Sequence, residues 1–375
     1  MPVNRERKTI FMQYIKIFTL SIILLLIVSC EGGTEIDSRF GLPDAGDSGG
    51  LLLETDQTRE SWYQVYFTAP DSPAASTLRG GPDAQLAEAI GAARLSVDIA
   101  MDSLNLWSIR DALLEAHQRG VAVRVVIDSE GLEVQEVQQL IGSGIEVVDD
   151  RRESLMHNKF AIIDRQEVWS GSMNFTVSGA YRSDNNLLHI QSAKLAEDYL
   201  VEFEEMFLDH LFGAGSPANT PLPVLEIEGS QVEVYFSPDD GMLERLLDLV
   251  SEAKQSVRFM AYSFTDDDLG QALIAARERG VAVIGVMDEA QARSNTGGEF
   301  QNLQGAGIDV RLDGNPGSMH HKVFIIDGET VVTGSYNFSK NARTRNDENT
   351  LILHNPEIGQ VYLEEFERVL EMAGD

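Results

Sequence analysis

Cysteine is almost absent from this sequence, since Cys30 is the only one among 375 residues. A lone cysteine can form no internal disulfide bond, and it cannot build a cysteine metal site. Long apolar runs are also scarce, and the clearest one, Ile17–Val28, is short for a membrane span. These absences exclude a disulfide scaffold and a zinc–cysteine module.

The N-terminal segment predicts a targeting signal instead. Basic residues precede the apolar run, which has the length of a signal-peptide core. The run ends in Ile27-Val28-Ser29-Cys30, which resembles the bacterial lipobox, whose cysteine is lipidated and becomes the first residue. We therefore expect residues 1–29 to be a lipoprotein signal peptide and Cys30 to anchor the protein in the bacterial cell envelope, on its periplasmic or extracellular face. The alternative is an uncleaved anchor helix from about Ile10 to Val28.

Positive charge is scarce as well. The chain has 29 Lys and Arg against 60 Asp and Glu, for a net charge of −31. Residues 1–29 hold four basic residues and one acidic residue, so 25 basic and 59 acidic residues remain after them, for −34. Such a surface repels bulk nucleic acid and anionic lipid headgroups. It leaves room for a small basic pocket inside an acidic shell, and solubility or adaptation to salt is an equally good explanation.

An internal repeat fills most of the remaining sequence. Residues 157–174, HNKFAIIDRQEVWSGSMN, and residues 320–337, HHKVFIIDGETVVTGSYN, both fit the pattern H-x-K-x4-D-x6-G-S-x-N. The string RGVAV also occurs twice, at residues 119–123 and 279–283. Two copies of one motif, each at the same place in a longer repeat, indicate two half-sites that work together.

Each copy of the repeat predicts the same succession of elements. A helix, a strand, a second helix and an apolar strand follow one another in this order: Asp83–Ala93, Ser96–Ala100, Leu106–Arg119 and Val121–Ile127 in the first copy, and Gly241–Ala253, Ser256–Tyr262, Asp268–Arg279 and Val281–Met287 in the second. Each copy ends in a further helix, Leu195–Phe207 or Pro356–Met372. Strand–helix–strand order indicates a mainly parallel sheet covered by helices.

We therefore expect an α/β fold of two tandem α-β-α halves, with mainly parallel or mixed sheets, packed as a pseudo-twofold dimer within one chain. The halves are residues 61–212 and 230–375. Residues 213–229, rich in Pro and Gly, are expected to be a linker. Residues 30–60 have few large apolar side chains and are expected to be a flexible tether.

Each motif brings one histidine and one lysine together. Residues i and i+2 of a strand point to the same side, so His157 is expected beside Lys159, and His320 beside Lys322. One imidazole can attack phosphorus while the other protonates the departing alkoxide, and the two lysines can neutralise the phosphate oxygens. No cofactor and no metal are expected, because a lysine on the same face opposes binding of a cation by the histidine.

The Gly-Ser-x-Asn turn that closes each motif suits a phosphate group. Its backbone N–H groups, hydroxyl and amide can cradle phosphate oxygens. The side chains concerned are Ser172 and Asn174 in the first half, and Ser335 and Asn337 in the second.

The doubled pattern resembles the signature of the phospholipase D superfamily, over roughly residues 60–375. The resemblance implies a two-step reaction through a covalent phosphohistidine, at a site where the two halves meet. By position in the motif, His157 and His320 would be the reactive imidazoles. The phosphate would be bound by Lys159, Lys322, Asn174 and Asn337, with Ser172 and Ser335 beside them. Asp164 and Asp327 would mainly fix the loop.

The two halves differ at one informative position. The family often has a carboxylate about 28 residues after the histidine, hydrogen-bonded to the imidazole. Glu348 takes this position in the second half and Asn185 in the first, where the neighbouring Asp184 is a competing partner. A carboxylate stabilises imidazolium, whereas an amide leaves the imidazole free to attack. His157 is therefore predicted to be the nucleophile and His320 the general acid.

The motif leaves the substrate open. The leading prediction is a lipid-anchored, monomeric phospholipase D-type hydrolase that cleaves a phospholipid, or another phosphodiester, on the headgroup side. A nuclease of the same superfamily is the first alternative, because the halves are compact. A cardiolipin synthase-like phosphatidyltransferase is the second, although such enzymes usually have two N-terminal membrane spans. A degenerate binding domain is disfavoured because both motifs are complete. Of the remaining histidines, His189 and His321 are expected to be structural.

Overall fold

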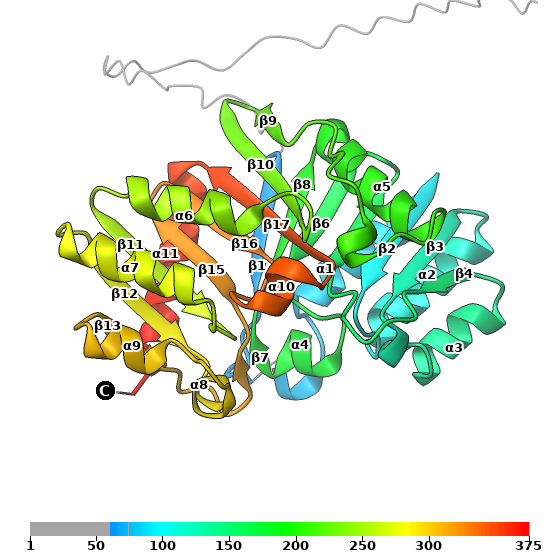
Figure 1. Ribbon diagram of the computed structural model, residues 1–375. Helices are drawn as coiled ribbons and strands as arrows, with labels where there is room; N and C mark the ends of the chain where they lie inside the picture. Colours follow the sequence, from blue (N-terminus) through cyan, green and yellow to red (C-terminus); the bar gives the residue numbers. More distant parts are fainter. Residues whose placement is uncertain (1–60, 74, 375) are drawn as a thin grey trace, which may run out of the picture. The chain divides into compact units, whose positions relative to one another are not determined.

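Two mixed β-sheets, one in each half, organise the chain in the computed structural model, which describes residues 61–73 and 75–374 (Figure 1). The first sheet has the strand order β1-β8-β6-β5-β2-β3-β4, and the second β13-β12-β11-β15-β16-β17-β10-β9. Apart from the edge strand β9, the two orders correspond strand by strand, as expected for an internal duplication. The predicted signal peptide, Cys30 and the tether lie outside the described residues.

The strands of the first half are β1 (Tyr63–Phe67), β2 (Ser96–Met101), β3 (Ala122–Ile127), β4 (Glu146–Asp149), β5 (Lys159–Ile163), β6 (Glu167–Gly171), β7 (Ser183–Asp184) and β8 (Asn186–Gln191). Those of the second half are β9 (Val224–Ile227), β10 (Ser230–Ser237), β11 (Ser256–Ala261), β12 (Ala282–Met287), β13 (Asp309–Leu312), β14 (Ser318–Met319), β15 (Lys322–Ile326), β16 (Thr330–Gly334) and β17 (Glu348–His354).

The helices follow the same duplication. The first half has α1 (Pro82–Ala92), α2 (Trp107–Gln118), α3 (Gln135–Gly142), α4 (Val177–Tyr181) and α5 (Ala193–Phe207). The second half has α6 (Met242–Glu252), α7 (Asp267–Glu278), α8 (Glu289–Ser294), α9 (Phe300–Gly305), α10 (Lys340–Thr344) and α11 (Pro356–Met372). No helix of the described residues is long and apolar enough to cross a membrane.

The predicted α/β class with two tandem halves is confirmed, and the sheets are mixed rather than mainly parallel. Within the two large sheets, the parallel pairs are those among β2, β3 and β4 and, likewise, among β11, β12 and β13. The strands that carry the motif are antiparallel to theirs, because β5 and β6 are joined by a short turn, as are β15 and β16. The segment expected to be only a linker also contains strand β9, which pairs with β10.

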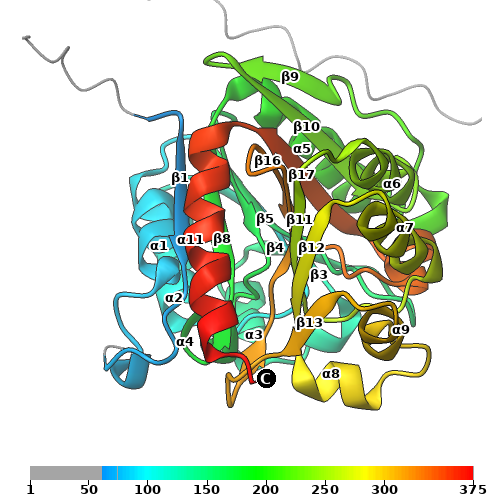
Figure 2. The same cartoon turned by 90° about the vertical axis from the view of Figure 1, so that its left-hand side faces the viewer.

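Helices α5 and α11 lie between the two sheets and belong to a core that both halves share. Figure 2 shows α11 running lengthwise between the strands of the two halves. Tyr199 and Phe203 of α5 pack in one cluster with Tyr362 and Phe366 of α11, and all four are buried. Separate clusters lie under the outer helices, beneath α1 to α3 in the first half and beneath α6, α7 and α9 in the second. Since burial of apolar surface drives association, the shared core holds the motif strands of the two halves together.

Candidate active site

Both motifs begin at the edge of a sheet where the parallel strands end. Lys159 pairs with Met101, the last residue of β2, and Lys322 pairs with Ala261, the last residue of β11. His157 precedes β5 by two residues and is 6% exposed, and His320 holds the equivalent place before β15 and is partly buried. The equivalent strands of both halves therefore present their histidines at the same edge.

Each lysine folds back onto the histidine of its own motif. Lys159 Nζ donates to the carbonyl oxygen of His157 at 2.9 Å, and Lys322 Nζ does the same to His320 at 2.9 Å. Lys322 Nζ also lies 3.2 Å from Nε2 of His320. Both lysines are 1% exposed, so two cations are buried beside the imidazoles. A buried pair of cations is a strong site for an anion.

The imidazoles are held crosswise, each by the opposite half. Nδ1 of His157 lies 2.7 Å from Oε2 of Glu348, and Nδ1 of His320 lies 2.9 Å from Oδ1 of Asn185. The expected pairing of Glu348 with His320 within one half is therefore wrong. The reason is that short bridges join the halves: β7 pairs with β14, and Met156 pairs with Asp347.

The motif serines hold the partners of the imidazoles. Ser172 Oγ donates to Oδ1 of Asn185 at 2.9 Å, and Ser335 Oγ donates to Oε2 of Glu348 at 2.7 Å. Both serines are 0% exposed, and each hydroxyl also accepts a backbone N–H, from Asn186 or Asn349. Their hydroxyl protons are thus used for positioning in this structure, and binding of phosphate by these serines stays a prediction.

The motif asparagines are less committed. The side-chain oxygens of Asn174 and Asn337 are buried and have no hydrogen-bond partner among the residues that the structure describes. Both residues follow the buried serine by two positions, at the end of the strand that enters the site. These oxygens can only accept hydrogen bonds, so binding of phosphate through the amide N–H groups of Asn174 and Asn337 stays a prediction.

Asp164 and Asp327 have a structural role here. Asp164 accepts the backbone N–H groups of Arg94, Leu95 and Ser96, and Asp327 those of three equivalent residues. Burial alone would raise the pKa of either carboxyl, yet the backbone donors hold the pKa below its usual value. Both aspartates have a positive φ, 52° and 53°, at the turn between the motif strands. They tie this turn to the start of β2 or β11.

His320 and Lys322 are electrostatically strained in the free protein. Burial, followed by the charges of Lys322 and Lys159, lowers the pKa of His320 well below its usual value. Burial and the charge of Lys159 likewise lower the pKa of Lys322 well below its usual value. A negative charge between these groups would relieve both effects, which is the electrostatic signature of an anion site.

Two further residues, which lie outside the motifs, contact the lysines. Asp102 Oδ2 lies 3.5 Å from Lys159 Nζ, and the ring of Tyr262 lies 4.7 Å from Lys322 Nζ and 4.4 Å from the ring of His320. Both residues directly follow the last residue of a parallel strand, β2 or β11. That position was the available signal, because side chains at the ends of parallel strands gather at one edge of the sheet.

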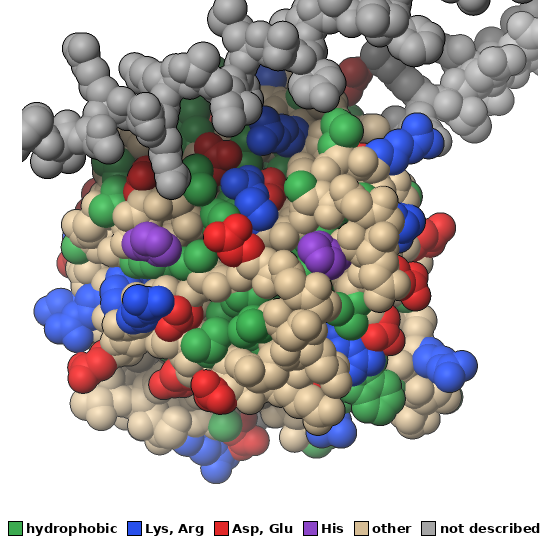
Figure 3. All heavy atoms as spheres, turned by 90° about the vertical axis from the view of Figure 1, so that its right-hand side faces the viewer, with side chains coloured by type: hydrophobic (Ala, Val, Ile, Leu, Met, Phe, Trp, Pro, Cys, Tyr) green, Lys and Arg blue, Asp and Glu red, His purple; other side chains and the backbone are tan. Residues whose placement is uncertain are grey.

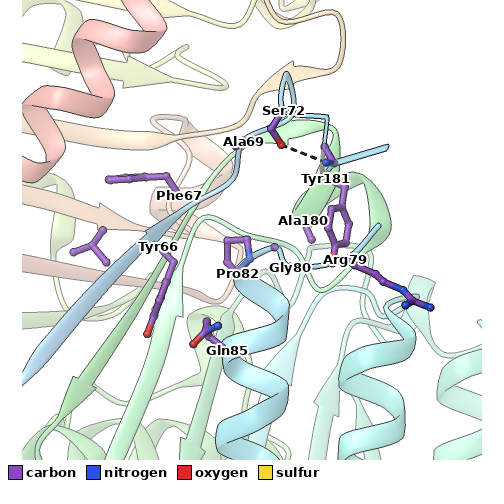
Figure 4. A pocket seen from close by; sticks show the side chains of 13 residues that line it. Tyr66, Phe67, Ala69, Ser72, Arg79, Gly80, Pro82, Gln85, Ala180 and Tyr181 are labelled. Carbon is purple, nitrogen blue, oxygen red and sulfur yellow. Dashed lines mark hydrogen bonds between the residues drawn. The ribbon is translucent and has the colours of Figure 1, made fainter. Parts of the chain in front are cut away.

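His189, His321 and the cavity beside β1 lie outside this centre. His321 is buried and paired with Glu365, and His189 lies 3.0 Å from Glu167, in agreement with a structural role. A cavity of about 310 Å³ lies between β1, the start of α1 and α4, with Tyr66, Pro82 and Tyr181 in its wall and no motif residue among those that line it (Figure 4). The described residues contain no group of three or more His, Cys, Asp or Glu arranged to hold a metal ion.

This fold and this site define a class of enzyme, the phosphodiesterases with two histidine–lysine motifs. A family model described as "Cardiolipin synthase, PLD-like domain" matches residues 86–207 and 246–370. The chain belongs to this phospholipase D-like family and is a phosphodiester hydrolase by class.

Relatives of known name match part of the chain. The phospholipase D of Rickettsia conorii is 36% identical over 141 residues, which are 38% of this chain and 70% of that protein. The human mitochondrial cardiolipin hydrolase is 37% identical over 132 residues, 35% of this chain and 52% of that protein. The phosphatidylserine synthase of Haemophilus influenzae covers 83% of this chain and 87% of its own, with a TM-score of 0.62 and 14% identity, and shows a shared fold.

Proposed function

We propose that this protein hydrolyses the headgroup phosphodiester bond of phospholipids through a covalent phosphohistidine, without a metal ion. The observation that carries the proposal is the crosswise pair of imidazoles, in which Glu348 holds Nδ1 of His157 and Asn185 holds Nδ1 of His320. With Nδ1 engaged on both rings, Nε2 is the reactive atom of each, and that of His320 lies 3.2 Å from Lys322 Nζ. The two buried lysines beside them supply the charge that a phosphate needs.

The crossed pairing places the carboxylate beside His157 rather than His320. A carboxylate favours imidazolium, so this contact alone would suggest His157 as the general acid. Attack through Nε2, however, turns the imidazole into a cationic phosphohistidine, and a carboxylate on Nδ1 stabilises the charge that develops in that step. For this reason we assign His157 as the nucleophile and His320 as the general acid.

The reaction then proceeds in two steps, formation and hydrolysis of the covalent intermediate. Nε2 of His157 attacks phosphorus, the bond from phosphorus to the headgroup oxygen breaks, and His320 gives its Nε2 proton to the leaving alcohol. A water molecule next attacks phosphorus, loses a proton to His320, and displaces His157, which leaves phosphatidic acid. Lys159, Lys322 and the amides of Asn174 and Asn337 bind the non-bridging oxygens throughout.

Protonation of His320 depends on the substrate. In the free protein, burial and the nearby lysines lower the pKa of His320 and favour the neutral ring. A bound phosphodiester places a negative charge beside the same lysines and raises this pKa, so the acid forms where it is needed. The same phosphate favours the charged form of Lys322, whose pKa is lowered by burial and by the charge of Lys159 in the free protein.

Several observations favour a lipid over nucleic acid. The relatives are a phospholipase D and a cardiolipin hydrolase by name. On the face of the first half drawn in Figure 3, Lys and Arg are interspersed with Asp and Glu, so this face has no continuous basic trough for a nucleic acid backbone. A lipid on Cys30 would hold an acidic enzyme at its substrate despite the net charge. A phosphatidyltransferase is the second candidate, because the matching family model has cardiolipin synthase in its description.

The test compares three substrates in one assay. The full chain in detergent is incubated with phosphatidylcholine, phosphatidylglycerol or single-stranded DNA, each with EDTA. Phosphatidic acid from the lipids supports the proposal, whereas DNA cleavage without lipid cleavage contradicts it. Loss of all activity in EDTA would contradict the metal-free reaction, and transfer of a phosphatidyl group to an added alcohol in preference to water identifies a transferase. Mass spectrometry of the trapped intermediate identifies the histidine that carries the phosphorus. If that histidine is His320, then His320 is the nucleophile and His157 the general acid.

A further inference from the structure

The residue before Glu348 is attached to the chain that leads into His157. The backbone N–H of His157 donates to the carbonyl oxygen of Asp347 at 2.9 Å, and the N–H of Asp347 donates to that of Leu155 at 3.0 Å. Asp347 is therefore bonded to both sides of Met156, and Glu348 reaches the ring of His157 from the next position. The position of Asp347 therefore determines the backbone hydrogen bond of His157 and also the position of Glu348, which bonds the ring of His157.

The carboxylate of Asp347 is buried and held by Arg152. Asp347 is 1% exposed and accepts hydrogen bonds from the Arg152 guanidinium and from the backbone N–H of Gly213. Arg152 also donates to the carbonyl oxygen of Arg345 at 3.4 Å and lies 5.4 Å from the ring of Phe212. Arg152 precedes His157 by only five residues, so the guanidinium ties the loop before the histidine to the segment that carries its partner.

The equivalent position beside His320 is built differently. The backbone N–H of His320 donates to Asp184, whose carboxylate is bound by Arg368 of α11 at 2.6 Å and by Asn315 at 2.6 Å. Asn315 is the repeat equivalent of Arg152, since each precedes its motif histidine by five residues. At His320 the cation thus comes from a helix rather than from the loop.

Helix α5 offers no such cation to Asp347. The repeat equivalents of Glu365 and Arg368 are Glu202 and Glu205, so an acid stands where the second half has an arginine. Burial and then the charge of Asp347 raise the pKa of Glu202 well above its usual value, which places Glu202 close to Asp347. Arg152 is therefore the cation that pairs with the buried Asp347 carboxylate on this side of the site. Removing one partner of a buried ion pair leaves an uncompensated charge, so this side depends strongly on Arg152.

We propose that Arg152 and Asp347 are positioning residues that set the orientation of the His157 imidazole for its attack on phosphorus. The inference rests on the proposed role of His157 as the nucleophile. The Arg152–Asp347 pair fixes the backbone of the loop and of the Glu348 segment together, and the imidazole follows both.

The experiment uses the full chain in detergent with phosphatidylcholine and the variant Arg152→Gln, with Arg368→Gln as the matched control on the other side. The rate of phosphohistidine formation is measured by rapid quenching. We expect Arg152→Gln to slow this rate roughly 10- to 100-fold, because a small misplacement of a reacting group costs about this much. Arg152→Lys should restore part of the rate. Arg368→Gln should act mainly on proton transfer by His320, seen as a changed pH profile.

A second measurement separates this inference from the proposed function. The hydrogen-bonded Nδ1 proton of His157 should give a downfield NMR signal, and Arg152→Gln should shift or abolish this signal even without substrate. An unchanged signal together with a wild-type rate of phosphohistidine formation would overturn the positioning role. Absence of any phosphohistidine in the unaltered enzyme would overturn the proposed mechanism instead, and the NMR signal would still decide the placement of His157. If Arg152→Gln does not fold, the same comparison is made with Asp347→Asn and Arg152→Lys.

Discussion

Glu348, in the second half, holds Nδ1 of His157, in the first half, at 2.7 Å and across 191 residues of sequence. The carboxylate is completely buried, and Ser335 and Asn346 also donate to it. Each imidazole of the site is thus oriented by the half to which it does not belong, which makes the two halves one catalytic unit.

Loss of the Glu348 carboxylate should disable the attack step. Glu348→Gln keeps the size of the side chain but removes the charge that would stabilise the proposed cationic phosphohistidine. We expect kcat to fall by ~10²- to 10⁴-fold, as for other buried carboxylates that orient a reactive imidazole. Steady-state kinetics on phosphatidylcholine measures this, with a thermal melt to show that the variant is folded. A kcat within a factor of two of the unaltered enzyme would contradict the assigned role.

The pH dependence should differ between the free enzyme and its complex with substrate. The pKa of His320 lies below its usual value in the free protein, so the protonated acid is lost as pH rises through that low pKa. The profile of kcat/KM, which reports the free enzyme, should therefore fall on its basic side at a pH below about 6.5. The profile of kcat should fall at higher pH, because the bound phosphate raises the pKa. Identical basic limbs in both profiles would show that the substrate does not tune His320.

A carboxylate beside His320 should shift the basic limb of the kcat/KM profile to higher pH. Asn185 accepts from Nδ1 of His320, and Asn185→Asp puts a negative charge at the same place. A neighbouring negative charge raises the pKa of an imidazole, so the basic limb of kcat/KM should shift upward by about one pH unit. Asn185→Ala is the control, since it removes the hydrogen bond without adding a charge. A shift that Asn185→Ala reproduces would not come from the charge.

Asp164 should matter for stability more than for chemistry. Its carboxylate accepts three backbone N–H groups, and Asp164→Ala leaves these donors to water, at a cost of about 2 kcal/mol in the free energy of unfolding. The pKa of Asp164 is lowered by folding, so this stability is present above its unfolded pKa and is lost as pH falls through the folded pKa. Chemical denaturation should show a large difference in the free energy of unfolding between Asp164→Ala and the unaltered protein at pH 7, and a small difference at pH 3. Asp327→Ala should show the same pattern. An equal difference at both pH values would exclude this origin.

The acids between α5 and the turn after β10 should weaken the protein as pH rises. Burial raises the pKa of Asp198 and of Asp239 to about 7, and that of Glu202 well above its usual value. Between about pH 4 and pH 7 the folded protein therefore binds more protons than the unfolded chain, and stability falls as pH rises across this window. Thermal melts should show a midpoint that decreases from pH 5 to pH 7, with a smaller decrease in Glu202→Gln. A midpoint that rises over this range would contradict the assignment.

Much of this molecule can be predicted from its sequence because the deciding signals are local. Apolar periodicity indicates the helices, and α11 begins and ends at the predicted residues Pro356 and Met372. The internal repeat predicts the tandem halves, and the motif predicts which histidines and lysines carry the chemistry. The share of antiparallel pairs is harder to predict, because strand–helix–strand order favours parallel neighbours, whereas the short turn at Asp164 makes β5 and β6 antiparallel.

The sequence by itself determined the reaction class, since two complete H-x-K-x4-D-x6-G-S-x-N motifs admit few other uses. Only the tertiary structure decided which half orients which imidazole. The partners of His157 and His320 lie 191 and 135 residues away, and no local pattern reports a contact over such distances. The core shared by α5 and α11 brings the halves together, and this packing places Glu348 on His157 and Asn185 on His320.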